Sequence, residues 1–155
     1  MKKTLSMLFA ILLLTLTMST ALAGDMPPAD QIAPSGSARL TWSNPCRSAT
    51  DELTINYWEC SIEPAGNAVY VYAATYANKV CDFVGGAFEV ERWEDNQWKV
   101  YRAQNYLGYR MESYDFGGSF AVEPGYYYRL VSYHEACLGD EYKGLQAITR
   151  SIYVN

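Results

Sequence analysis

The sequence predicts an all-β domain, an antiparallel sandwich or barrel, and three observations support this. Short segments rich in β-branched and aromatic residues recur between turn residues at intervals of roughly ten residues. Tyrosine is abundant, with 14 residues against 5 phenylalanines and 4 tryptophans, and strands favour aromatic side chains. Beyond the N-terminal apolar run, no segment repeats apolar residues at helical spacing.

The first 23 residues are typical of a cleavable secretory signal peptide. A basic start, Lys2-Lys3, precedes an apolar run over residues 5–18, and the small-x-small pattern Ala21-Leu22-Ala23 precedes Gly24. The run is shorter than the roughly 20 residues that span a bilayer. No cysteine directly follows the cleavage site, and no hydrophobic tail ends the chain. We expect cleavage between Ala23 and Gly24 and secretion without a membrane anchor.

Removing 23 of the 155 residues leaves 132, enough for one domain that buries about two-thirds of its unfolded surface. Residues 24–36 contain three prolines and two glycines, which predicts a flexible leader before a single β-sandwich domain at 37–155. The signal holds two of the 12 basic residues, so the chain after cleavage has 10 basic and 17 acidic residues and a formal charge of −7. This charge argues against nucleic acid and anionic membranes as partners.

Nine strands are expected, at residues 38–43, 53–62, 68–77, 87–94, 97–102, 110–114, 119–122, 126–135 and 146–154. The segment Glu63-Pro64-Ala65-Gly66-Asn67 predicts a tight turn, and Asp95-Asn96 predicts a two-residue hairpin loop. In such a hairpin Trp93 and Trp98 face each other, a pair that contributes about 0.2 to 1 kcal/mol. Apolar alternation breaks before Trp93, which indicates a bulge near Arg92 or a looser loop.

Residues 122–130 carry an apolar-x-Pro-Gly-x-x-Tyr pattern. The pattern resembles the corner before strand F of fibronectin type III and immunoglobulin-like domains. The resemblance implies an immunoglobulin-like/fibronectin-III-like antiparallel β-sandwich with Tyr128 as the tyrosine-corner residue, its ring packed inward and its hydroxyl bonded to the backbone upstream. A tyrosine-rich hairpin strand is the alternative.

A wider resemblance covers residues 57–155. It is carried by Val90-Glu91-Arg92-Trp93-Glu94-Asp95-Asn96-Gln97-Trp98-Lys99-Val100, Gly125-Tyr126-Tyr127-Tyr128-Arg129, Tyr133-His134 and Ser151-Ile152-Tyr153-Val154. These segments are similar to a family of small exported proteins of Gram-positive bacteria, classed only as a domain of unknown function. The resemblance implies export and a fold, but no activity. Residues 37–50 lie outside it.

All four cysteines follow the signal, where thiols become oxidised, so two disulfides are expected. A zinc site is the alternative, but no C-x-x-C pair exists. Four cysteines allow three pairings. The immunoglobulin-like resemblance implies that Cys81, between strands B and C, pairs with Cys137, just past strand F, which leaves Cys46 with Cys60.

We predict no catalytic, cofactor-binding or metal-binding residue. His134, the sole histidine, lacks a G-x-S-x-G partner and is interpreted as a strand-end residue. Acidic pairs such as Glu94-Asp95 and Asp140-Glu141 suit glycoside hydrolysis only at a defined separation, and such loop carboxylates are usually solvated. Gly85-Gly86 and Asp115-Phe116-Gly117-Gly118 are interpreted as turns, because phosphate-loop spacing is absent.

Several aromatics fall in or beside predicted loops and are candidate binding residues: Tyr106, Tyr109, Tyr114 and Tyr142, with Trp42 and Trp58 nearer the N-terminus. Flat rings offer large contact area at low entropy cost. The sequence therefore favours a secreted, non-enzymatic protein-interaction module, with a carbohydrate-binding module as the alternative and a carboxylate hydrolase third. The expected partner is an extracellular protein or glycan, and an open strand edge allows self-association by β-addition.

Overall fold

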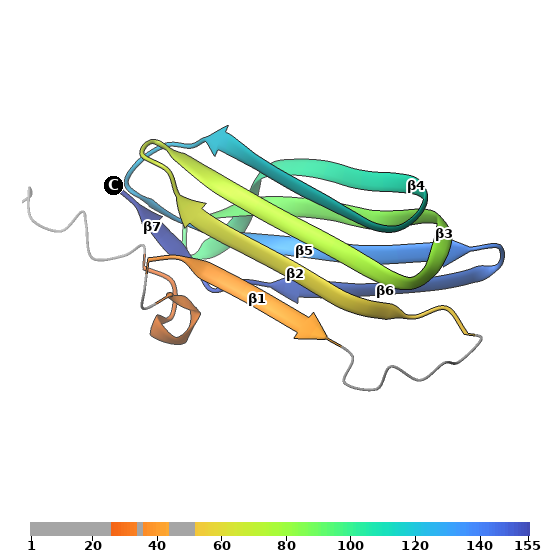
Figure 1. The fold of residues 1–155 in the computed structure, drawn as a ribbon. Helices are drawn as coiled ribbons and strands as arrows, with labels where there is room; N and C mark the ends of the chain where they lie inside the picture. The colour runs from red at the N-terminus through yellow and green to blue at the C-terminus, as the bar shows by residue number, and fades with distance from the viewer. Residues whose placement is uncertain (1–25, 34–35, 44–51) are drawn as a thin grey trace, which may run out of the picture.

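The computed structural model describes residues 26–33, 36–43 and 52–155 (Figure 1). Its elements are the 3-10 helix η1 (Ala29–Gln31) and the strands β1 (Ala38–Ser43), β2 (Ile55–Pro64), β3 (Ala68–Glu94), β4 (Gln97–Ala121), β5 (Tyr126–Leu138), β6 (Glu141–Ile148) and β7 (Ile152–Val154). The all-β prediction is confirmed for these residues. The predicted signal peptide with its cleavage site, and Cys46, lie outside them.

The seven strands form one antiparallel sheet that curls into two layers (Figure 1). The strand order is β1-β2-β3-β5-β6, with β4 along the other edge of β3 and β7 beside β5. The first half of β3 pairs with β2 and its second half pairs with β5, while β4 follows β3 throughout. We therefore name a first layer, which contains β1 and β2, and a second layer, which contains β5, β6 and β7. The bent β3–β4 hairpin belongs to both.

The long hairpin differs from the predicted series of short strands. The predicted strands 68–77 and 87–94 are parts of one strand of 27 residues, β3, and β4 has 25 residues. The bend lies where the register between β3 and β4 shifts, between Tyr76 and Cys81. Cys81 therefore lies within β3, and its prediction as a loop residue was wrong. The prediction for residues 38–43 agrees with β1.

Gly85 and Gly86 lie inside β3, so their interpretation as turn glycines was wrong. Their φ angles are 137° and 150°, which residues with a side chain rarely adopt. A Cβ on Gly86 would lie 1.7 Å from the backbone oxygen of Tyr133 on β5. Glycine is needed here because neighbouring backbones approach closely. The segment 115–118 also lies within a strand, β4, rather than in a turn.

Both predicted hairpin turns are confirmed. Gly66, with φ 66°, lies between β2 and β3. Asp95 and Asn96, with φ 53° and 58°, join β3 to β4 as the only residues between the two strands. The predicted Trp93–Trp98 pair forms, with ring centroids 5.1 Å apart in an edge-to-face arrangement. A register shift between Val90 and Glu91 marks the predicted irregularity.

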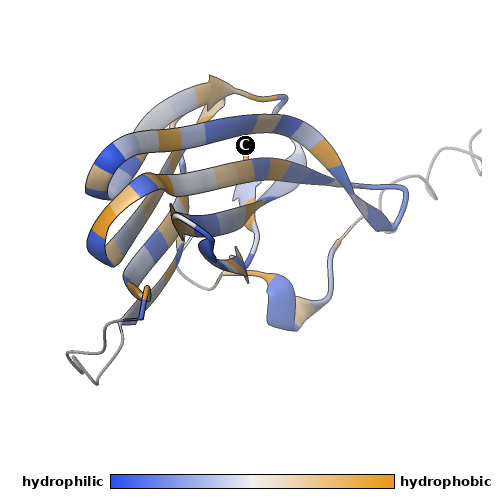
Figure 2. Ribbon diagram, turned by 90° about the vertical axis from the view of Figure 1, so that its right-hand side faces the viewer, coloured by the Kyte–Doolittle hydropathy of each residue, from blue (hydrophilic) through white to orange (hydrophobic). Residues whose placement is uncertain are grey.

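The core lies between the two layers. Hydrophobic and hydrophilic residues alternate along the strands (Figure 2), which places one side of each strand inward. Tyr128 is fully buried and its hydroxyl donates to the backbone carbonyl of Glu123 at 2.8 Å, the contact expected of a tyrosine corner. The largest fully buried side chains also include Phe88, Leu53, Ile62, Leu130 and Ile152.

Part of the predicted leader packs on the domain. Ile32, just after η1, forms a parallel bridge with Ser151, and Ala33 donates its N–H to the Ser151 carbonyl at 2.7 Å. Gln31 accepts from the Trp98 indole at 3.1 Å. These contacts hold the described residues of the leader against the C-terminal end of the second layer.

Candidate functional site

A band of tyrosines covers the outward side of the first layer. Tyr70, Tyr72 and Tyr76 alternate with buried residues along β3, so their side chains point away from the core. Tyr57 of β2 pairs with Tyr76 in the strand register. Glu59 of β2 and Asp115 of β4 both pair with Ala74, between Tyr72 and Tyr76. We call these six residues the tyrosine face: Tyr57, Glu59, Tyr70, Tyr72, Tyr76 and Asp115.

The β2 side of the tyrosine face is held in place by direct contacts. The rings of Tyr57 and Tyr76 meet edge to face, with centroids 5.3 Å apart. The Tyr57 hydroxyl donates to Glu59 at 2.5 Å, and Arg39 of β1 forms an ion pair with Glu59 at 2.7 Å. The carboxylate raises the pKa of Tyr57. The charge of Glu59 is therefore largely balanced within the fold.

Asp115, on the β4 side, is not balanced in this way. It is exposed and has no ion-pair partner among the described residues. Burial, followed by the charge of Asp115, raises the pKa of Tyr72 to about 12. Serine and glycine occupy the neighbouring outward positions of β4, namely Ser113, Gly117 and Ser119. The face thus combines rigid rings, small residues and one unbalanced negative charge.

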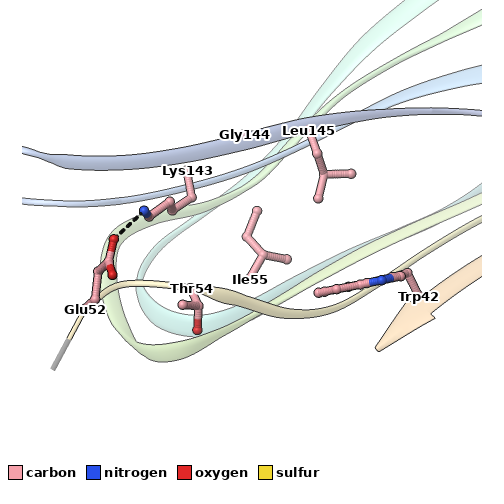
Figure 3. Close-up of a pocket in the computed structure, with 7 residues that line it drawn as sticks. All are labelled: Trp42, Glu52, Thr54, Ile55, Lys143, Gly144 and Leu145. Carbon is pink, nitrogen blue, oxygen red and sulfur yellow. Dashed lines mark hydrogen bonds and ion pairs between the residues drawn. The ribbon is translucent and has the colours of Figure 1, made fainter. Parts of the chain in front are cut away.

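A pocket of about 360 Å³ opens between the edges of the two layers (Figure 3). Its walls are the indole of Trp42 from β1, Ile55 from β2, and Gly144 and Leu145 from β6. Glu52 and Lys143 form an ion pair of 2.8 Å at one end. Trp42 is 42% exposed although it lies on the same side of its sheet as the buried Cys60.

The four tyrosines predicted as binding residues do not form one patch. Tyr106 is only 2% exposed, so its prediction as a surface residue was wrong. Tyr109 and Tyr142 are exposed and share one row across the outward side of the second layer, separated by Phe83 and Cys137. Tyr114 packs near Gly108 of the same strand, within the bend.

Tyr106 instead belongs to a buried polar cluster with Thr75 and His134. The Nδ1 atom of His134 lies 2.9 Å from the Thr75 hydroxyl and 3.0 Å from the Tyr106 hydroxyl. Thr75 donates to the carbonyl of Gly85 at 2.8 Å, and Tyr106 lies within hydrogen-bond distance of the Tyr133 carbonyl. Sequence reasoning missed this cluster because its members are far apart along the chain.

His134 is fully buried inside β5, rather than at a strand end as predicted. Burial lowers its pKa to about 4, an effect that the Ala74 carbonyl partly offsets, so the ring is neutral near pH 7. The Trp58 ring lies over it at 5.0 Å. Burial also raises the pKa of the Cys60 thiol to about 12 and that of Tyr106 to about 12. The Cys60 thiol and the Tyr106 hydroxyl are therefore protonated near pH 7.

The three cysteines in the described ranges are free thiols, so neither predicted disulfide is present there. Cys60 is fully buried, and its predicted partner lies outside the described residues. Cys137 pairs in register with Phe83, two residues beyond Cys81 on the neighbouring strand. Burial raises the pKa of Cys81, and proximity to Cys137 adds to this.

No group of three or more His, Cys, Asp or Glu side chains in the described ranges is arranged to hold a metal ion. No helix within the same ranges is long and apolar enough to cross a membrane. Comparison with protein-family models, curated proteins and solved structures finds no match to this chain.

Proposed function

We propose that this chain is a secreted, non-enzymatic protein-interaction module that binds its partner through the tyrosine face. The observation that carries the proposal is the composition of this surface. Antibody binding loops are enriched in tyrosine, serine and glycine, because tyrosine gives large contact area with few rotatable bonds and the small residues adapt to a partner. Interfaces in general are enriched in aromatic residues. The paired strands β2, β3 and β4 hold these residues on one side of the sheet.

The charge of the face indicates the chemistry of the partner. Asp115 is exposed and unbalanced, and the chain carries 17 acidic against 12 basic residues. An arginine of a partner can pair with Asp115 and stack on the ring of Tyr72 or Tyr76. We therefore expect an extracellular protein with an arginine-rich or lysine-rich contact patch, and binding that weakens as salt concentration rises.

The test is affinity capture from extracellular protein fractions with residues 24–155 as bait. A face variant, Tyr70→Ser with Tyr76→Ser, is compared with a control variant, Tyr109→Ser with Tyr153→Ser, which removes two exposed tyrosines from the opposite layer. We expect one protein that the wild type and the control retain and the face variant loses, with binding confirmed on the purified pair. Equal retention by all three baits, or no retained protein, contradicts the proposal.

A carbohydrate-binding module is the second candidate, and the pocket beside Trp42 favours it. An indole wall suits stacking against a sugar ring, and Glu52, Thr54 and Lys143 offer polar groups for its hydroxyls. A glycan array compares the wild type with Trp42→Ala. Saturable binding to one sugar class that the variant loses supports this function, and a blank array removes it.

Export and the immunoglobulin-like relationship are also proposals. The Tyr128 hydroxyl bond to the Glu123 carbonyl supports the relationship, and the pattern of residues 1–23 supports export. Expression of the full chain in a secreting bacterial host tests the second proposal. We expect protein in the medium whose N-terminal sequence starts at Gly24, and retention in the cells with residue 1 intact contradicts it.

A further inference from the structure

The edge strand β6 has a row of backbone groups with no partner strand among the described residues. It ends the strand order of its layer and pairs with β5 on one side only. Just past β6, Thr149 donates its N–H to the carbonyl of Leu130, the residue opposite. Because hydrogen-bonded and non-bonded pairs alternate in antiparallel strands, residues 141, 143, 145 and 147 bond to β5. The backbone groups of Tyr142, Gly144, Gln146 and Ile148 therefore point to the free side.

Side chains leave this edge accessible. Tyr142 donates its hydroxyl to Glu135 at 2.9 Å, and Gln146 donates to the Tyr133 hydroxyl at 3.1 Å, so both lean back over β5. Gly144, between them, has no side chain. Natural proteins commonly protect such edges with charges, prolines or bulges. The edge of β4 is interrupted by the bend and carries Arg102 and Arg110, whereas β6 has no proline and no register shift, and its central charged residue, Lys143, is paired with Glu52.

We propose that two copies of this chain join their β6 strands edge to edge, antiparallel, with Leu145 on a two-fold axis. This register sets Gly144 opposite Gln146 of the second copy, and Tyr142 opposite Ile148 of the second copy. Each of these two pairs occurs twice by symmetry, and in each the free backbone groups of both copies face each other. This allows about eight backbone hydrogen bonds. Tyr142 and Ile148 are 55% and 44% exposed in the single chain, and the dimer covers these two side chains in both copies.

The two ends of the free stretch of β6, and the charged residues beside them, are consistent with this register. The β5–β6 turn bounds the free stretch at one end, and the bridge between Ile32 and Ser151 bounds it at the other. The register sets Asp140 opposite Arg150 of the second copy, once at each end of the interface. Both residues are exposed and have no ion-pair partner in the described ranges. Lys143 does not oppose pairing, because Glu52 balances its charge.

The dimer does not rest on the proposed function, because the tyrosine face lies on the first layer. It would add to that function. Two tyrosine faces on one particle allow bivalent binding, which strengthens attachment to a repetitive target without any new contact. A monomeric protein with an active tyrosine face would refute the dimer alone.

Analytical ultracentrifugation of residues 24–155 over a wide concentration range tests the dimer. We expect a dimer for the wild type, about tenfold weaker for Asp140→Arg and for Arg150→Asp, since each sets like charges together at both ends. The double variant, Asp140→Arg with Arg150→Asp, should regain wild-type association. A monomeric wild type, or a double variant no tighter than the single ones, overturns the proposal. Circular dichroism checks that every variant is folded.

A cross-link tests the register itself. The two Leu145 residues face each other across the axis as a non-hydrogen-bonded pair, about 4.5 Å apart at Cα, within the range of a disulfide. Leu145→Cys should therefore form a covalent dimer on mild oxidation, with residue 145 linked to itself in the peptide map. Ala147→Cys, which faces Lys143 of the second copy, is the matched control. Equal cross-linking of the two variants overturns this register.

Discussion

Mild acid should destabilise this protein through His134. The ring is fully buried, its pKa is lowered to about 4, and the ordinary value of 6.5 applies once the chain unfolds. Between these values the unfolded chain binds a proton that the folded one does not, so stability rises with pH. The contribution of His134 is complete above about pH 6.5 and is lost as the pH falls toward about 4.

The size of the loss follows from the two pKa values. Their difference converts at about 1.4 kcal/mol per pH unit to a limit of about 3 kcal/mol below pH 4. At pH 5.5 the loss is about 1.4 kcal/mol, and at pH 5 it is about 2 kcal/mol. This is a large share of the roughly 5–15 kcal/mol that stabilises a typical domain.

Urea denaturation, followed by tryptophan fluorescence at several values from pH 7.5 to 5, measures this loss. The comparison is His134→Phe, which keeps a flat ring beneath Trp58. In this variant Thr75 retains the Gly85 carbonyl and Tyr106 retains the Tyr133 carbonyl as acceptors, so neither hydroxyl is orphaned. Carboxylates titrate alike in both proteins. Parallel pH profiles for wild type and variant would refute the reasoning, because the histidine would then contribute no pH dependence.

Three further predictions concern the fold. Gly86→Ala should prevent folding because its Cβ would collide with backbone, whereas Gly66→Ala, with open space around it, should cost about 1 kcal/mol; thermal melts of the soluble fraction distinguish them. Tyr128→Phe should cost about 1 kcal/mol in urea denaturation, by removing the corner hydrogen bond; an unchanged midpoint would show that the bond contributes nothing. Cys81 and Cys137 are free thiols in the structure but lie near each other on neighbouring strands, so an oxidising compartment should link them; non-reducing peptide mapping of the secreted protein that finds Cys81 free, or linked to another cysteine, contradicts the predicted pairing.

Local features of the fold could be predicted from the sequence because their causes are local. Asp95 and Asn96 tolerate positive φ, so two residues suffice to fix the hairpin and to pair the tryptophans on either side. The corner at Tyr128 depends on a hydrogen bond that spans five residues. In each case the residues that interact are also close along the chain, so a local sequence pattern is enough to predict the contact.

The bend of β3 could not be predicted in this way. Gly85 and Gly86 have the composition of a turn, but their role is to let β4 and β5 approach the β3 backbone. Nothing near them in the sequence identifies those neighbours. Tyr106 shows the same limit, because a tyrosine beside an apparent turn is buried once β4 follows β3 through the bend. Tyr70, Tyr72 and Tyr76 of the tyrosine face lie at alternate positions of one strand, which places them on one side of the sheet, and aromatics in loops do not reveal such a face.

The buried cluster explains how the two layers are held in one arrangement. Thr75 precedes the bend and Gly85 follows it, so the bond from the Thr75 hydroxyl to the Gly85 carbonyl joins the two halves of β3. Tyr106 of β4 and His134 of β5 bond to the same hydroxyl. Polar groups buried without partners are costly, so a change in the angle between the layers that separated these three side chains would be disfavoured. Hydrogen bonds are more directional than apolar contacts, and the cluster therefore favours the observed curvature of the strand that carries the tyrosine face.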